Sequence, residues 1–246
     1  MKVRYSYLEE QFKNPAPVFE GIAEVLRTGD FTLGKAVEEF EQKFARLIGT
    51  QFAVGVNSGT DALFLSLKAL GIGPGDEVIT VSQTFVATVG AIVQAGARPV
   101  FIDVTDEFTM NPALLEKAIT SRTRAIMPVH YAGHPADMPE IMEIARRHGL
   151  PVVEDACQAI GAAVNGKNVG TFGSAAGFSL HPLKNLNVWG DSGIIVTDSK
   201  EIRDKLIMLR NHGLRGRDEV AVFGYNTRLD SIQAVVGNWL IKDTEW

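Results

Sequence analysis

The sequence predicts an α/β fold whose central sheet is mainly parallel and is flanked by helices. Short runs rich in β-branched residues alternate repeatedly with segments of helical length, which is the pattern of α/β domains. The strand-like runs are apolar throughout, as expected for strands that are buried on both faces. With 246 residues, 46% of them hydrophobic and 22% charged, the chain has the composition of a globular protein with a sizeable core.

The elements follow in a regular order. An irregular N-terminal segment, residues 1–33, is expected to pack on a large domain formed by residues 34–246. That domain begins with an amphipathic helix over 34–49, because its apolar residues from Val37 to Leu47 recur at helical spacing. We expect strands over 52–56, 77–81, 98–104, 124–129, 151–155, 174–180 and 193–197. We expect helices over 60–70, 113–119, 138–149 and 199–210. A further helix follows the strand over 77–81 and ends at 95, and the last begins near 229.

The C-terminal part of the sequence has two features of its own. Residues 211–228 read as a long polar loop. The helix that starts near Leu229 shows no stop signal before Trp246, so we expect more chain to follow in the complete protein.

Charge and targeting signals narrow the classes of function. The net charge is −5 and no Lys/Arg cluster is present, which argues against a nucleic-acid partner. The single Cys157 cannot form an intramolecular disulfide, and the N-terminus lacks the apolar stretch of a signal peptide, so a cytoplasmic location is expected. The most apolar run outside the expected strands, 84–97, is shorter than the roughly 20 residues of a membrane helix, and no membrane association is expected.

Candidate binding residues lie where the expected strands end, because ligands of open parallel sheets bind at the carboxyl ends of the strands. The first strand is followed by NSGTDAL, residues 57–63, a small-residue turn into a helix N-terminus. Such a terminus, with the hydroxyls of Ser58 and Thr60, suits an anion and above all a phosphate. Taken alone, an ordinary N-cap explains these residues better.

Three side chains at other strand ends have a similar double interpretation. Phe85 could cover a planar ring, although a place in the core is the simpler explanation. Asp155 would end a buried strand, where a carboxylate is costly unless it is paired. A role in binding a ligand and a pairing with a structural partner explain it equally well. Lys184, five residues after Ser179, could be a buried Schiff-base lysine or, more simply, a lysine lying along a loop surface.

Together these positions indicate one site, because a phosphate cradle, an aromatic ring, a carboxylate and a lysine are the set that pyridoxal phosphate requires. A metal site is not expected. His130 and His134 are four residues apart, but Gly133 and Pro135 break any helix there and no third ligand is near in the sequence.

The ordered motifs resemble those of one family. NSGTDAL, SQTFVAT, PVHYAGHPADM, VVEDACQAIGA, FSLHPLKNLNVWGDSG, LRNHGL and GYNTRLDSIQA are similar to motifs of the DegT/DnrJ/EryC1/StrS sugar aminotransferases, from about residue 5 to the last helix. The resemblance implies the aspartate-aminotransferase-like fold, called fold type I, with pyridoxal 5'-phosphate as cofactor. It also implies a smaller C-terminal domain, which is absent from these 246 residues, so the sequence corresponds to the cofactor-binding large domain.

The resemblance also implies roles for individual residues. Lys184 matches the lysine that forms the Schiff base and shuttles the proton, and Asp155 matches the acid on the pyridine nitrogen. The positions that match the remaining cofactor contacts are Phe85 on the ring, Gln158 near its phenolic oxygen, Gly59, Thr60 and Ser179 on the phosphate, and Asn226 on the phosphate of a neighbouring subunit. A homodimer with a shared active site is therefore implied.

The activity that the resemblance implies is amino transfer, with glutamate as the usual donor, to a nucleotide-linked keto sugar. The product is an amino sugar, and the turn KNLNVWGDSG resembles members that act at C-3 of a dTDP-hexulose. Arg210, Arg215 and Arg217 could meet a diphosphate or form a solvated loop face.

The sequence also bears on three rival functions. A sugar dehydratase of the same fold would replace Lys184 with histidine. A non-catalytic regulatory or sensing homologue is conceivable because the C-terminal domain is missing, and failure to bind the cofactor would favour it. A Rossmann oxidoreductase would need a glycine fingerprint that GVNSGTD does not supply.

Overall fold

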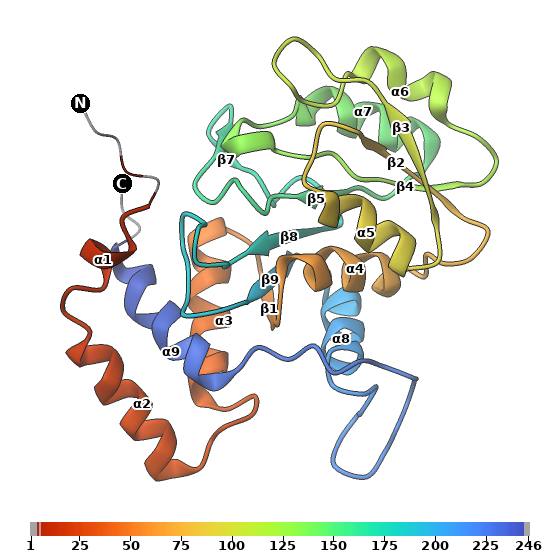
Figure 1. The fold of residues 1–246 in the computed structure, drawn as a ribbon. Helices are drawn as coiled ribbons and strands as arrows, with labels where there is room; N and C mark the ends of the chain where they lie inside the picture. The colour runs from red at the N-terminus through yellow and green to blue at the C-terminus, as the bar shows by residue number, and fades with distance from the viewer. Residues whose placement is uncertain (1–3, 5, 244–246) are drawn as a thin grey trace.

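The protein is described by a computed structural model that covers residue 4 and residues 6–243 (Figure 1). Its central sheet comprises β1 (Phe52–Val56), β2 (Glu77–Val81), β3 (Arg98–Ile102), β4 (Thr123–Ile126), β5 (Val153–Asp155), β8 (Ala175–Ser179) and β9 (Gly193–Thr197). Hydrogen bonds join the strands in two sets, β3-β2-β4 and β1-β9-β8-β5. The parallel bridges Ile126–Val152 and Val129–Asp155 connect β4 to β5, so the order across the sheet is β3-β2-β4-β5-β8-β9-β1.

Strand direction places the carboxyl ends together. β9 is antiparallel to both of its neighbours, β1 and β8. The pairs β5–β8, β2–β4 and β2–β3 are parallel. Within the described residues, therefore, every strand of this sheet except β9 runs the same way and ends at the same edge. The predicted α/β fold with a mainly parallel sheet is confirmed.

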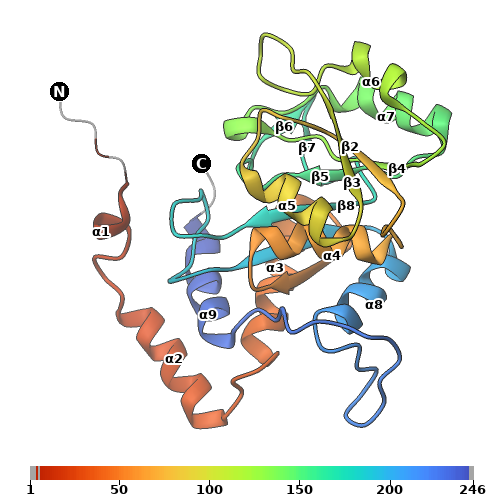
Figure 2. The same cartoon turned by 45° about the vertical axis from the view of Figure 1, so that its right-hand side comes forward.

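Helices cover both faces of the sheet (Figures 1 and 2). They are α2 (Ala16–Thr28), α3 (Lys35–Ile48), α4 (Gly59–Ala69), α5 (Val86–Gln94), α6 (Pro112–Ala118), α7 (Met138–His148), α8 (Lys200–Leu209) and α9 (Ser231–Leu240). Short elements complete the described chain: α1 (Leu8–Gln11), η1 (Tyr131–Gly133), β6 (Ala163–Val164), β7 (Lys167–Asn168) and η2 (Ile241–Asp243). No helix within the described part is both long and apolar enough to cross a membrane.

The strands are apolar on both faces because each face meets a different set of helices. Ile194 and Val196 of β9 belong to the cluster built with α3 and α9, whereas Ile195 between them belongs to the cluster built with α4 and α8. This alternation is the period-2 geometry of a strand. It explains the unbroken apolar runs from which the buried sheet was predicted.

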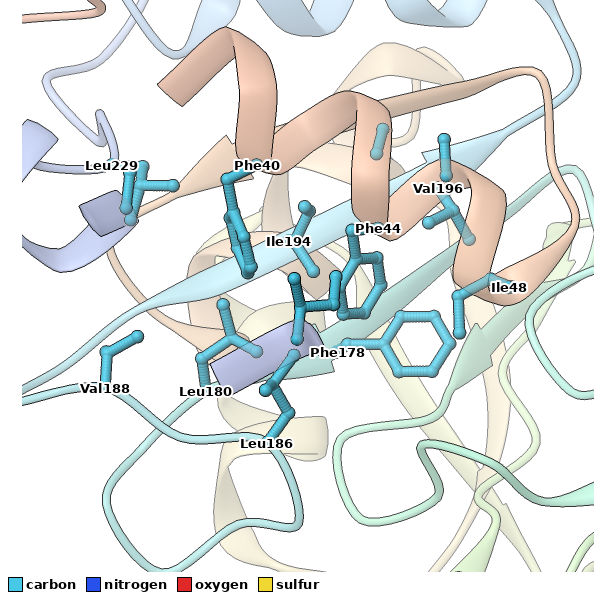
Figure 3. Close-up of a cluster of buried hydrophobic side chains, with 14 of the residues drawn as sticks. Phe40, Phe44, Ile48, Phe178, Leu180, Leu186, Val188, Ile194, Val196 and Leu229 are labelled. Carbon is cyan, nitrogen blue, oxygen red and sulfur yellow. The ribbon is translucent and has the colours of Figure 1, made fainter. Parts of the chain in front are cut away.

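The helix α3 shows how one face is filled (Figure 3). Phe40 and Phe44 are fully buried, and the Phe44 ring meets the Phe178 ring of β8 edge-on at 5.3 Å between centroids. Gly237 of α9 is required here, because a Cβ atom at this position would lie 2.6 Å from Phe40. The predicted amphipathic helix thus packs in one cluster with β8, with α9 and with Leu186 of the loop that carries Lys184.

The N-terminal segment differs from the expectation of irregular structure, because residues 16–28 form the helix α2. Val18 and Val25 are buried and Ile22 packs against the same core cluster, so the apolar residues recur at helical spacing and the signal for this helix was present in the sequence. Gly21 allows close packing on α9, since a Cβ atom there would lie 2.6 Å from Val235 Cγ1. The helix ends at Gly29, whose φ of 73° is left-handed, the usual glycine stop.

Candidate active site

A cavity of about 390 Å³ lies at the shared carboxyl edge of the sheet. Its volume falls in the usual range of cofactor sites. It is lined by residues that follow β1, β2, β4, β5 and β8. Of the predicted site residues, the cavity brings together Gly59, Thr60, Phe85, Asp155, Gln158, Ser179 and Lys184.

The anion cradle is the N-terminus of α4. The Ser58 hydroxyl accepts a hydrogen bond from the Asp61 N–H at 3.0 Å, so it caps the helix as the simpler explanation proposed. Gly59 follows at the first helical position, and a Cβ atom there would lie 2.7 Å from Ser179 Cβ and 3.0 Å from Cys157 Sγ. The cradle therefore depends on a glycine packed against small neighbours, and helix N–H groups beyond the cap face an anion-sized space.

One acidic group lies close to this cradle. Burial raises the pKa of Asp61, although hydrogen bonds from Ser58 and Asn57 act in the opposite direction. The Ser58 hydroxyl lies 3.2 Å from Asp61 Oδ2. Burial also raises the pKa of the Cys157 thiol, with the charge of Asp155 acting in the same direction, so Cys157 stays neutral.

Asp155 ends β5 and is buried beside the first turn of α5. Its backbone is fixed by two hydrogen bonds, from its N–H to Pro128 O at 2.9 Å and from the His130 N–H to its carbonyl at 3.0 Å. Its Oδ1 accepts from the Cys157 N–H at 3.1 Å, and its Oδ2 accepts from the Thr88 hydroxyl at 2.5 Å. Each carboxylate oxygen thus has one hydrogen-bond partner within the protein.

Glu154, the preceding residue, is buried on the other side of β5. Its carboxylate accepts from the backbone N–H groups of Gly170, Phe172 and Gly173 at 2.7 to 2.8 Å. His130 Nε2 lies 3.1 Å from Glu154 Oε2, and His130 Nδ1 accepts from the Ala136 N–H at 3.1 Å. The ring proton is thus on Nε2, and both ring nitrogens of His130 are occupied by protein partners.

Lys184 lies in the loop between β8 and β9, and its side chain is partly buried in the cavity wall. The loop is held by the Lys184 N–H, which donates to His181 O at 2.8 Å, and by the Asn187 amide, which donates to Lys184 O at 3.2 Å. Among the described residues, no acceptor is within hydrogen-bond distance of the Lys184 amine. The lysine therefore lies in the cavity wall with an unengaged amine.

Phe85 and Gln158 occupy the mouth and the wall of the cavity. Phe85 is 65% exposed, so the simpler explanation of a core phenylalanine is wrong. Gln158 Oε1 accepts from the Ala132 N–H at 2.7 Å. This bond fixes the amide, and its NH₂ group points away from Ala132.

The sequence profile of the DegT/DnrJ/EryC1/StrS aminotransferase family matches residues 16–245. The chain belongs to this family. The resemblance found in the sequence motifs is thereby confirmed.

Some curated relatives within the family carry enzyme names, whereas one from Geobacillus stearothermophilus that is 45% identical, covering 96% of this chain and 64% of the relative, is named pleiotropic regulatory protein. One from Acidithiobacillus ferrooxidans, named UDP-N-acetyl-3-dehydro-alpha-D-glucosamine 3-aminotransferase, is 51% identical over 220 residues, covering 89% of this chain and 60% of the relative. Another from Streptomyces venezuelae, named dTDP-3-amino-3,4,6-trideoxy-alpha-D-glucose transaminase, is 50% identical over 216 residues, covering 87% of this chain and 57% of the relative. The chain thus spans about 60% of the length of these relatives.

A solved structure shows the same architecture. The crystal structure of S. venezuelae DesV in complex with a ketimine intermediate matches with a TM-score of 0.94 and 46% identity, covering 98% of this chain and 67% of that one. The aspartate-aminotransferase-like fold that the motifs implied is confirmed.

Asn226 is the predicted site residue that the structure places elsewhere. It is exposed and lines a separate pocket of about 280 Å³ with Thr32, Asn57 and Arg228. It lies in the segment 211–228, which Figure 1 shows projecting below α8. Within a single chain, then, Asn226 is not part of the cavity that holds Lys184.

Of the three arginines weighed as diphosphate ligands, Arg210 is unavailable. Its buried guanidinium pairs with Glu41 and donates to Gly55 O at 2.7 Å, so it holds β1 to α3. Arg215 lies 3.3 Å from Glu219 on the exposed loop. The sequence could not distinguish these cases, because Glu41 is 169 residues away from Arg210 along the chain.

Two site residues were missed by the sequence argument. Thr84 and Thr88 both line the cavity, and their hydroxyl oxygens lie 2.6 Å apart. The signal was their spacing, because residues four apart on either side of a helix start come together at its first turn.

Proposed function

We propose that the chain is the large domain of a pyridoxal-phosphate-dependent aminotransferase that transfers an amino group from glutamate to a nucleotide-linked keto sugar. The observation that carries this is the cavity in which the unengaged amine of Lys184, the buried carboxylate of Asp155 and the N-terminus of α4 converge. The relatives named as sugar transaminases support the same reaction. In this proposal residues 34–246 form the cofactor-binding domain, and residues 1–33 pack on it.

The residues present fit the cofactor. Gly59 lets the N-terminus of α4 approach β8 closely, since a Cβ atom there would be 2.7 Å from Ser179 Cβ, and this terminus lines the cavity where a phosphate would bind. The Thr60 and Ser179 hydroxyls complete this cradle, and both line the cavity. Phe85 offers an exposed ring face at the cavity mouth, and the Gln158 amide is fixed at its wall.

When bound, pyridoxal phosphate supplies an electron sink that lets a proton leave the α-carbon of an amino donor. Lys184 would hold the cofactor's aldehyde group through its amine, and the same amine would serve as the base that accepts and returns that proton. Asp155 would face the pyridine nitrogen, and Phe85 would cover the ring at the cavity mouth.

The sugar is proposed to react at C-3. The names of both relatives specify a sugar with its keto or amino group at position 3. The sugar is linked to UDP in one name and to dTDP in the other. The turn that follows Lys184 resembles members that act at C-3 of a dTDP-hexulose, which makes dTDP-linked 3-keto sugars the first substrates to test.

The active site is proposed to be shared in a homodimer. Asn226 lies outside its own cavity on an exposed segment, which suits a residue that reaches the phosphate of a neighbouring subunit. We also propose that the complete enzyme has a smaller C-terminal domain, and that it is cytoplasmic, where an unpaired thiol such as Cys157 stays reduced.

The deciding experiment is the visible absorption spectrum of the chain with added pyridoxal phosphate, followed by borohydride reduction and peptide mapping. We expect a Schiff-base band and a reduced adduct on Lys184, and neither in Lys184→Ala. Lys167→Ala is the matched control, since Lys167 lies over the Phe172 ring, away from the cavity residues. No band and no adduct in the wild-type chain would contradict the proposal and favour a non-catalytic regulatory role.

A second measurement addresses the substrate. With the cofactor bound, glutamate and then dTDP- and UDP-linked 3-keto sugars are added, and amino-sugar formation is followed by mass spectrometry. Turnover of 3-keto but not 4-keto sugars supports the proposed position. Loss of water from the sugar without amino transfer would instead indicate the dehydratase.

A further inference from the structure

The carboxylate of Asp155 is held by the hydroxyl of Thr88. One of its oxygens accepts from a backbone N–H, that of Cys157, and the other accepts from the Thr88 hydroxyl at 2.5 Å. Thr88 is 1% exposed and lies in the first turn of α5. The Cys157 thiol also interacts with this carboxylate, but a thiol is a much weaker hydrogen-bond donor than a hydroxyl.

The proton positions along this contact follow from simple counting. A hydroxyl has one proton to donate, and Thr88 gives it to an acceptor-only carboxylate. The Thr88 oxygen must therefore accept from Thr84 Oγ1, which lies 2.6 Å away. The resulting chain runs in one direction, from Thr84 through Thr88 to Asp155. Bonds in such a chain polarise and strengthen one another.

The same short loop also places the aromatic ring at the cavity mouth. Phe85 lies between the two threonines and directly precedes α5, and the Thr88 N–H donates to Phe85 O at 3.1 Å. The β2–α5 loop thus fixes the ring-covering residue and the hydroxyl on the acid as one unit. Movement of either one displaces the other.

We propose that Thr88, supported by Thr84, is a positioning residue that orients the Asp155 carboxylate toward the pyridine nitrogen of the cofactor. The inference rests on the proposed function, because Asp155 has this task only if pyridoxal phosphate is bound. Thr88 lines the cavity beside the acid that it orients. Its contribution is the hydroxyl proton, which an isosteric valine lacks.

The test uses the full 246-residue chain loaded with pyridoxal phosphate that carries ¹⁵N at the ring nitrogen. The ¹⁵N chemical shift reports whether that nitrogen is protonated, and a fluorescence titration gives cofactor affinity. In Thr88→Val we expect a shift toward the unprotonated form and an affinity lower by about tenfold or more, the usual effect of losing a hydrogen bond to a charged group. Thr88→Ser is expected to restore both, and Thr84→Val to change them less.

Two reference variants separate the explanations. Thr80→Val removes another buried hydroxyl, which donates to Met127 O at 2.9 Å outside the cavity, and should leave the ¹⁵N signal unchanged. Asp155→Asn should give the full loss of protonation. An unchanged signal in Thr88→Val beside a shifted one in Asp155→Asn would overturn the role of Thr88 alone. A wild-type chain that binds no cofactor would overturn the proposed function, and the inference with it.

Discussion

Glu154 and Asp155 are adjacent buried carboxylates at the end of β5, yet they have different surroundings. Glu154 faces the segment 170–173 and is satisfied by three backbone N–H groups and the His130 ring. Asp155 faces the cavity and accepts from one backbone N–H and one hydroxyl. A carboxylate whose acceptor sites are all filled by the fold is structural, whereas one that retains capacity toward a cavity is available to a ligand.

The largest expected effect is a loss of stability when Glu154, rather than Asp155, is changed to its amide. In Glu154→Gln, the new NH₂ group must face N–H donors that the carboxylate accepted, which leaves buried donors unsatisfied. We expect unfolding free energy to fall by about 3 kcal/mol or more, since each unsatisfied buried group costs roughly 1–3 kcal/mol. Urea unfolding of the chain without cofactor measures it.

The matched variants complete this comparison. Glu107→Gln alters an exposed pair with His134 and should change the unfolding free energy by less than about 0.5 kcal/mol. Asp155→Asn should cost less than Glu154→Gln in the absence of cofactor while abolishing tight cofactor binding. Equal losses of stability in the two variants would remove the distinction between the acids.

The second prediction concerns the small residues of the cradle. In Gly59→Ala, the added methyl would meet Ser179 Cβ at 2.7 Å, so α4 or β8 must shift. We expect a loss of about 1–3 kcal/mol, typical of overpacking, together with weaker phosphate binding. Gly90→Ala is the control, because Gly90 in α5 has no atom within 4 Å of a new Cβ and should gain roughly 0.5–1 kcal/mol. A stabilised Gly59→Ala protein would show that the cradle tolerates bulk.

The third prediction extends the comparison to the opposite edge of the sheet. Glu77 begins β2, where it accepts hydrogen bonds from Thr120, Arg98 and Arg122, and these hold its pKa at about 2, below the ordinary 4.5. A lowered carboxyl pKa gives stability that is complete above the ordinary value and is lost as the pH falls toward the folded value. Glu77→Gln should flatten the fall of stability between about pH 4.5 and pH 2, as measured by thermal unfolding across that range. The same slope in wild type and variant would contradict it.

These cases show which parts of the site could be predicted from the sequence. Positions at strand ends, such as Gly59, Asp155 and Lys184, were predictable because a parallel sheet gathers its carboxyl ends at one edge. The two partners that define Asp155 and Arg210, namely Thr88 and Glu41, were not, since each lies on a different element far along the chain. The helix α2, in contrast, was predictable, since Val18, Ile22 and Val25 recur at helical spacing.

The smallest expected effect on stability belongs to Phe85, and it gives the clearest contrast with the core aromatics. Its ring is 65% exposed, so Phe85→Ala removes little buried surface and should change the unfolding free energy by less than about 0.5 kcal/mol, whereas Phe44→Ala should cost about 3–5 kcal/mol. Cofactor affinity should respond in the opposite order, falling in Phe85→Ala because the ring face is lost. Calorimetric unfolding without cofactor and a cofactor titration measure the two effects on the same protein. A Phe85→Ala chain that loses stability but binds the cofactor normally would show that the ring serves the fold, and that an exposed aromatic at a strand end is no guide to a site.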